Sequence, residues 1–128
     1  MNAPRSPVPL AIIRIAYLVG PLLFGVSTWF LHRQGAWTPD ILPRALGFLP
    51  AIGIVVAIVG IMVVRMFRAS ATDPVRRASL AIVGWALGEM SALAGGVYYW
   101  LAGDARWFVT GVLLLLLSFL LLPLDDAN

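Results

Sequence analysis

The side chain best suited to chemistry in this 128-residue chain is that of Glu89, its only glutamate. Glu89 lies in the middle of an otherwise apolar run, residues 81–96, with the sequence AIVGWALGEMSALAGG. If this run crosses a membrane, Glu89 lies near the bilayer midplane, where an ionised side chain costs about 3 kcal/mol on insertion scales. We therefore expect Glu89 to be mostly protonated, buried between helices and able to donate a hydrogen bond.

Two main roles for Glu89 follow from this position, and both stay open. As a structural group, it would bond a hydroxyl or the carbonyl of Tyr17, which Pro21 leaves without its amide donor. As a functional group, it would carry a proton or a cation. A third interpretation is a contact with another subunit or a cofactor. The hydroxyl groups that the sequence offers as partners are those of Ser27, Thr28, Ser91 and Thr110.

Small residues recur on the Glu89 run about once per helical turn, and they predict a helix-packing face. Such residues let a second helix approach the backbone closely, which is a common way for membrane helices to associate. A four-residue spacing drifts by about 40° per step on a helix of 3.6 residues per turn, so we expect a tilted crossing. This small-residue strip consists of Gly84, Gly88, Ala92, Gly95 and Gly96.

The composition indicates a membrane protein and argues against several functions. The chain is 61% hydrophobic and 12% charged, with a mean hydropathy of +0.93, well above ordinary soluble domains. It contains no Cys and one His, so we expect no disulfide, metal site or haem. Its nine basic residues, all Arg, are scattered between apolar runs, unlike a nucleic-acid-binding face. Without a nucleophile–base pair or a phosphate loop, we expect neither enzyme activity nor a cofactor.

Four apolar runs, separated by segments rich in Gly, Pro or charged residues, have lengths suited to crossing or nearly crossing a bilayer about 30 Å thick. We therefore predict an all-α fold, in which residues 1–128 form one polytopic membrane domain with a bundle of four transmembrane helices. The last run is short, and its uniform Leu face predicts contact with lipid. The predicted spans cover about residues 10–31, 45–67, 80–101 and 107–122.

The distribution of arginine predicts the orientation in the membrane. Four spans put both termini on one side, and six arginines lie on that side against three in the outer loops. The positive-inside rule therefore predicts cytoplasmic termini in a bacterial inner membrane. Four of the six also form a cluster that would attract anionic lipid headgroups, at about 1 kcal/mol per residue. These four are Arg65, Arg68, Arg76 and Arg77, and the other two are Arg5 and Arg14.

Residues 88–97, with the sequence GEMSALAGGV, resemble the carboxylate helix of the proteolipid c subunits of rotary ATP synthases. In that family a midplane Glu is also followed by a small residue, an aliphatic residue, a Gly and a Val. The resemblance extends over residues 45–101 and implies a hairpin whose carboxyl group carries an ion. The chain departs from that pattern because its second span has fewer glycines and two further spans flank the hairpin.

Residues 85–89 (WALGE) and 101–103 (LAG) form a Trp-Ala-Leu-x-Glu motif ahead of a Leu-x-Gly turn. Over most of its length the chain thereby resembles a family of small, uncharacterised four-span integral membrane proteins of bacteria. This resemblance implies a fold and a membrane location, without an activity. We expect the partners to be the lipid bilayer and either further copies of the chain or a larger membrane complex.

Overall fold

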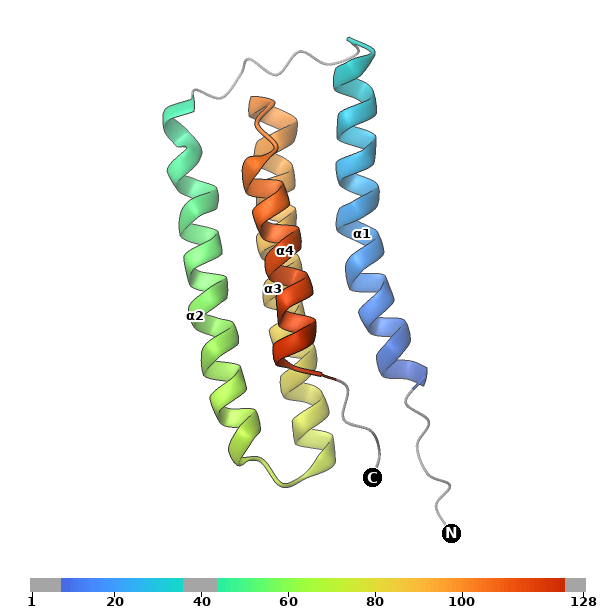
Figure 1. Cartoon of the computed structure of the whole chain (residues 1–128), viewed down its shortest axis with the longest axis vertical. Helices are drawn as coiled ribbons and strands as arrows, with labels where there is room; N and C mark the ends of the chain where they lie inside the picture. The colour runs from blue at the N-terminus through green and yellow to red at the C-terminus, as the bar shows by residue number, and fades with distance from the viewer. Residues whose placement is uncertain (1–7, 36–43, 124–128) are drawn as a thin grey trace.

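The computed structural model describes residues 8–35 and 44–123. Their regular structure is entirely helical, so the predicted all-α class is confirmed. Figure 1 shows the four long helices running alternately up and down. They are α1 (Val8–Arg33), α2 (Phe48–Ser70), α3 (Pro74–Ala102) and α4 (Arg106–Leu121), with a 3₁₀ turn, η1 (Arg44–Gly47), directly before α2.

Three of these helices, α1, α2 and α3, are long and apolar enough to cross a membrane. The fourth helix, α4, is apolar but has 16 residues. At 1.5 Å per residue it is about 24 Å long, less than the ~30 Å of a bilayer core. The structure therefore supports a membrane protein with three helices of spanning length.

The ends of α3 follow from local capping. Asp73 is the N-cap and accepts a hydrogen bond from the backbone N–H of Val75 (3.1 Å), while Pro74 occupies the first helical position. The helix therefore begins six residues before Leu80, the predicted start of the third span. It ends at Gly103, whose φ of 74° is the left-handed conformation that glycine adopts most easily.

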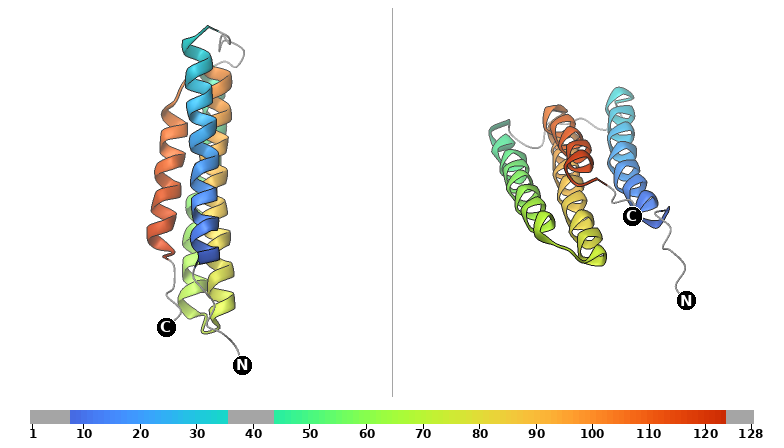
Figure 2. Two further views of the ribbon diagram at one scale, coloured as in Figure 1. Left: turned by 90° about the vertical axis from the view of Figure 1, so that its right-hand side faces the viewer. Right: turned by 60° about the horizontal axis from the view of Figure 1, so that its bottom comes forward.

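Helix α3 is central and packs against each of the other three helices. Figure 1 shows α1 and α2 on opposite sides of α3, and Figure 2 shows α4 on one face of the row that these three helices form. The N-terminal end of α1, the α2–α3 connection and the C-terminal end of α4 lie together at one end of the bundle, which we call the α2–α3 end.

Helix α4 makes the most extensive contact with α3. The expectation that the fourth span presents its Leu face to lipid is therefore wrong for the side of α4 that packs against α3. Leu115 is completely buried, whereas Leu113 and Leu116 face outward. The reason is that Gly111 and Ser118 lie on the same side as Leu115, and these small residues let α4 come close to α3.

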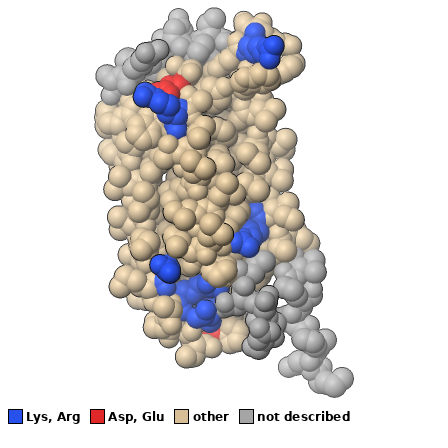
Figure 3. All heavy atoms as spheres, viewed as in Figure 1, with Lys and Arg blue, Asp and Glu red and all other residues tan. Residues whose placement is uncertain are grey.

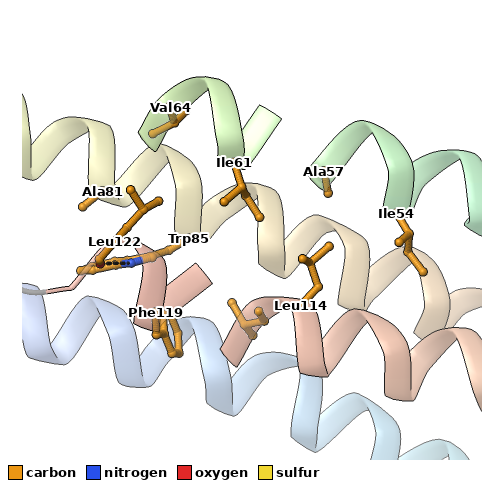
Figure 4. Close-up of a cluster of buried hydrophobic side chains, with 10 residues drawn as sticks. Ile54, Ala57, Ile61, Val64, Ala81, Trp85, Leu114, Phe119 and Leu122 are labelled. Carbon is orange, nitrogen blue, oxygen red and sulfur yellow. Dashed lines mark hydrogen bonds between the residues drawn. The ribbon is translucent and has the colours of Figure 1, made fainter. Parts of the chain in front are cut away.

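The hydrophobic core lies between α2, α3 and α4 (Figure 4). Trp85 of α3 is completely buried there, meets the ring of Phe119 edge-on (87°) and donates its Nε1–H to the carbonyl of Leu122 (3.0 Å). Helix α1 adds only partly buried side chains to this core. In the most apolar 18-residue stretch of each spanning-length helix, 11% of α1 is buried inside the bundle, compared with 28% of α2 and 44% of α3. Helix α1 is therefore the least embedded of the three.

Candidate functional site

Glu89 lies on the side of α3 that faces α1, and its side chain is partly buried. Its Oε1 atom is 3.6 Å from the point that a Cβ atom on Gly20 would occupy, so the carboxyl group lies against the backbone of α1. The next residue of α1, Pro21, is buried and lacks the N–H that would have bonded the carbonyl of Tyr17. Glu89 therefore lies close to the point where the hydrogen bonding of α1 is interrupted.

None of the four hydroxyl groups considered from the sequence bonds Glu89 in the structure. Ser91 donates to the carbonyl of Gly88 (2.7 Å) on the α4 side of α3, and Thr110 donates to the carbonyl of Arg106 (2.8 Å). Ser27 is exposed, and the buried hydroxyl of Thr28 has no partner. Within residues 8–35 and 44–123, the carboxyl group of Glu89 has neither a hydrogen-bond partner nor an ion-pair partner.

The small-residue strip lies against α4 over most of its length. A Cβ atom on Gly88 would come within 2.9 Å of the Cα atom of Leu115, and one on Gly95 within 2.7 Å of the backbone nitrogen of Phe108. At its end the strip turns toward α1, where a Cβ atom on Gly96 would lie 3.0 Å from the ring of Phe24. This turn follows from the four-residue spacing, which precesses around the helix. Gly84 and Ala92, the other members, are also buried.

Sequence reasoning missed one residue of α4 that lies close against this strip, Gly111. A Cβ atom there would lie 2.6 Å from both the Cα atom of Ala92 and the carbonyl oxygen of Ser91. The two helix backbones therefore cross here with no room for a side chain. The sequence does contain a sign of this close helix contact, because Gly111 is the one glycine in the leucine-rich run of residues 107–122.

Three side chains, one from each of the other helices, donate hydrogen bonds to backbone carbonyls at the C-terminal end of α4, and we call them the carbonyl-capping cluster. The last carbonyls of a helix have no partner within the helix, and an unsatisfied one costs several kcal/mol in hydrocarbon. The cluster therefore gives hydrogen-bond donors to the carbonyls at which α4 ends. The bonds run from Arg14 to Phe119, from Trp85 to Leu122 (3.0 Å) and from Arg68 to Pro123 (2.7 Å).

Arg14 also lies between two aromatic rings. Its guanidinium carbon is 5.3 Å from the ring centroid of Trp85 and 4.7 Å from that of Phe119, both within the range of a cation–π interaction. Trp85 precedes Glu89 by one turn on the same side of α3. The sequence indicated Arg14 only as an orientation signal, because the position of an arginine in one span does not reveal which aromatic residues of other spans surround it.

The four arginines predicted to contact anionic lipid differ in exposure. Arg68 is only 5% exposed and donates from Nε to the carbonyl of Arg77 (3.2 Å). Arg77 donates in return to the carbonyl of Arg68 (2.8 Å), so the two side chains close the connection between α2 and α3. Arg65 and Arg76 are exposed. Figure 3 shows that most charged side chains gather near the two ends of the molecule, with an apolar surface between them.

In the described part of the chain, no three His, Asp or Glu side chains gather where they could hold a metal ion. Comparison of the chain with protein-family models, curated proteins and solved structures gives no match. The fold and the site define an all-α protein with three helices of membrane-spanning length and a single carboxyl group between two of them.

Proposed function

We propose that the chain is a small structural or accessory protein of the bacterial inner membrane, in which Glu89 is a mostly protonated interhelical carboxyl group that holds α1 on α3. The chain would cross the membrane four times with both termini in the cytoplasm, and it would act as a homo-oligomer or within a larger membrane complex. The observation that carries the proposal is the position of the carboxyl group against the backbone of α1 at Gly20.

The other polar contacts along α1 support a role for Glu89 in stabilising the packing of α1 on α3. Near one end of α1, Arg14 donates to the carbonyl of Phe119, and near the other end His32 Nε2 donates to the carbonyl of Trp100 (3.1 Å). Glu89 lies between these two contacts. Because α1 is the least embedded helix and lipid provides no hydrophobic force between helices, a polar contact near its middle would stabilise its docking. The acceptor we propose for the protonated carboxyl group is the carbonyl of Tyr17, to which the structure shows no bond from Glu89.

Substitution of Glu89 in the purified protein tests this proposal. Glu89→Gln keeps a donor and is expected to leave stability in detergent nearly unchanged. Glu89→Leu removes the donor and should destabilise the protein by about 1 kcal/mol, the scale of a hydrogen bond between membrane helices, or dissociate the assembly. Stability is read from circular dichroism during sodium dodecyl sulfate titration, and oligomeric state from light scattering.

A matched control is Ser27→Leu, which makes the same polar-to-apolar change on the exposed side of α1. We expect it to stay within about 0.5 kcal/mol of the unchanged protein, as is usual for surface substitutions. Equal stability of the unchanged protein, the Glu89→Gln variant and the Glu89→Leu variant would refute the structural role.

A proton- or cation-translocating role for Glu89 is the second candidate. It is favoured by the partial exposure of Glu89 and by the lack of a partner among the described residues. A transported ion needs a carboxyl group that it can reach and leave, and intramembrane carboxyl groups of this kind serve in proton relays. Labelling with a hydrophobic carbodiimide separates the two roles. Labelling that depends on pH and that a coupling cation prevents would favour transport, and an unreactive Glu89 would exclude it.

A further inference from the structure

A groove of about 470 Å³ opens between α1 and α4 on the surface of the bundle. Its walls are apolar, formed by Ala11, Ile15 and Leu18 from α1 and by Leu116 and Leu120 from α4. Its volume lies within the roughly 300–1,000 Å³ of sites that bind small molecules. The groove also adjoins the carbonyl-capping cluster, because Arg14 and Phe119 line it.

Among the described residues that line this groove, Arg14 is the one that carries a charge. A guanidinium group has five N–H donors, of which the structure uses one, from Nη2 to the carbonyl of Phe119. The Nε atom of Arg14 is buried without a partner. No carboxylate of the described residues pairs with the charge, so the cation has ring faces and one carbonyl but no anion.

We propose that this groove is a binding site for one acidic phospholipid, with the lipid phosphate on the Arg14 guanidinium and an acyl chain along the apolar walls. Arginine is suited to phosphate because its planar donors match two phosphate oxygens. The apolar walls match a hydrocarbon chain, and Arg14 is the only charged contact among the described lining residues. An ion pair with a phosphate would also compensate a cation that otherwise lies in a low-dielectric environment.

The surroundings select an acidic lipid over a zwitterionic one. The exposed Arg65 and Arg76 lie at the same end of the bundle, and each arginine near the surface attracts anionic lipid by about 1 kcal/mol. A zwitterionic headgroup would add a positive charge next to a region that is already basic. This site is distinct from Glu89, because it lies between α1 and α4 and does not depend on the role of that carboxyl group.

The test is native mass spectrometry of the full chain, delipidated in dodecylmaltoside and titrated with phosphatidylglycerol or phosphatidylcholine. We expect one phosphatidylglycerol to bind at least tenfold more tightly than phosphatidylcholine. Arg14→Gln should lose at least tenfold in phosphatidylglycerol affinity, consistent with the loss of a charge-assisted hydrogen bond. Arg33→Gln is the matched control, because Arg33 is also on α1 and over a ring, that of Trp29, but outside the groove.

A second variant keeps the test decisive if Arg14→Gln does not fold. Ala11→Phe fills the groove and leaves Arg14 and its bond to Phe119 unchanged, so it should retain the melting temperature of the lipid-free protein and lose phosphatidylglycerol binding. Equal affinity for the two lipids would overturn the proposal. So would undiminished phosphatidylglycerol binding by a folded Ala11→Phe variant, or an equal loss of binding in Arg33→Gln.

Discussion

The close crossing of α3 and α4 at Gly111 predicts a large effect from one added methyl group. Carbon atoms in good contact lie about 3.5–4.0 Å apart, whereas a Cβ atom at Gly111 would lie 2.6 Å from the Cα atom of Ala92 and from the carbonyl oxygen of Ser91. Both obstructing atoms belong to the backbone, so no side-chain rotation can relieve the clash. Gly111→Ala therefore requires the two helices to separate by on the order of 1 Å.

The expected loss of stability is the difference of two effects. A gap of about 0.5–1 Å removes a quarter to a half of the attraction of each contact that opens, and overpacking of a well-packed interface costs about 1–3 kcal/mol. Replacing glycine by alanine inside a helix stabilises the helix by about 1 kcal/mol. Because the obstructing atoms belong to the backbone, we place the overpacking cost near the upper value, about 3 kcal/mol. Subtracting the gain of about 1 kcal/mol, we expect Gly111→Ala to destabilise the protein by about 2 kcal/mol.

Gly53→Ala is the matched control for this prediction. Gly53 is also a helix-interior glycine that faces α3, but the nearest atom to its added Cβ would be the Cβ of Ala94 at 3.9 Å, an ordinary contact. This variant should gain up to about 1 kcal/mol, so the two variants should differ by about 3 kcal/mol. Unfolding in mixed dodecylmaltoside and dodecyl sulfate micelles, followed by circular dichroism, measures both. If Gly111→Ala is as stable as Gly53→Ala, the described crossing of α3 and α4 is refuted.

Two further predictions concern the arginines and the orientation of the chain. Arg68→Gln should destabilise the protein by about 1.5–3 kcal/mol in the same assay, because charge-assisted bonds to the carbonyls of Arg77 and Pro123 are lost. The exposed neighbour Arg65→Gln should stay within about 0.5 kcal/mol, and equal losses would contradict the described burial of Arg68. A protease site fused after Asn128 should be cut only from the cytoplasm, and cleavage from the outside would reverse the proposed orientation.

The helices themselves were largely predictable, because long apolar runs and their polar connections mark them directly in the sequence. The four runs predicted at residues 10–31, 45–67, 80–101 and 107–122 correspond to α1–α4. The differences at helix ends have local causes. For example, η1 occupies residues 44–47 at the start of the second predicted span, so that α2 begins at Phe48.

The neighbours of each helix were not predictable, because in a membrane protein both sides of a helix are apolar. Helix α2 illustrates this. Ile54 and Ile61 are buried against the bundle, whereas Val55 and Val59 are more than half exposed, and no difference in polarity separates the two pairs. In water the apolar stripe of a helix identifies its buried side. In lipid only small or polar residues do so, and this is why the strip on α3 was recognisable while the inner face of α2 was not.

The same physics explains why the polar contacts of α1 could not be assigned in advance. Arg14 lies only about one turn inside its span, away from the midplane depth of Glu89, so the sequence favours separate roles for the two residues over an ion pair. It does not identify the residues that surround Arg14. In the structure the ring of Trp85 faces the Arg14 guanidinium, and Glu89 follows Trp85 by one turn on α3. The ring of Phe119 and its carbonyl contact the Arg14 cation, and among the described residues the carboxyl group beside Gly20 has no counter-ion. This is the basis of the role proposed for Glu89, because a carboxyl group in hydrocarbon without a counter-ion favours its neutral form and could then donate to a backbone carbonyl on α1.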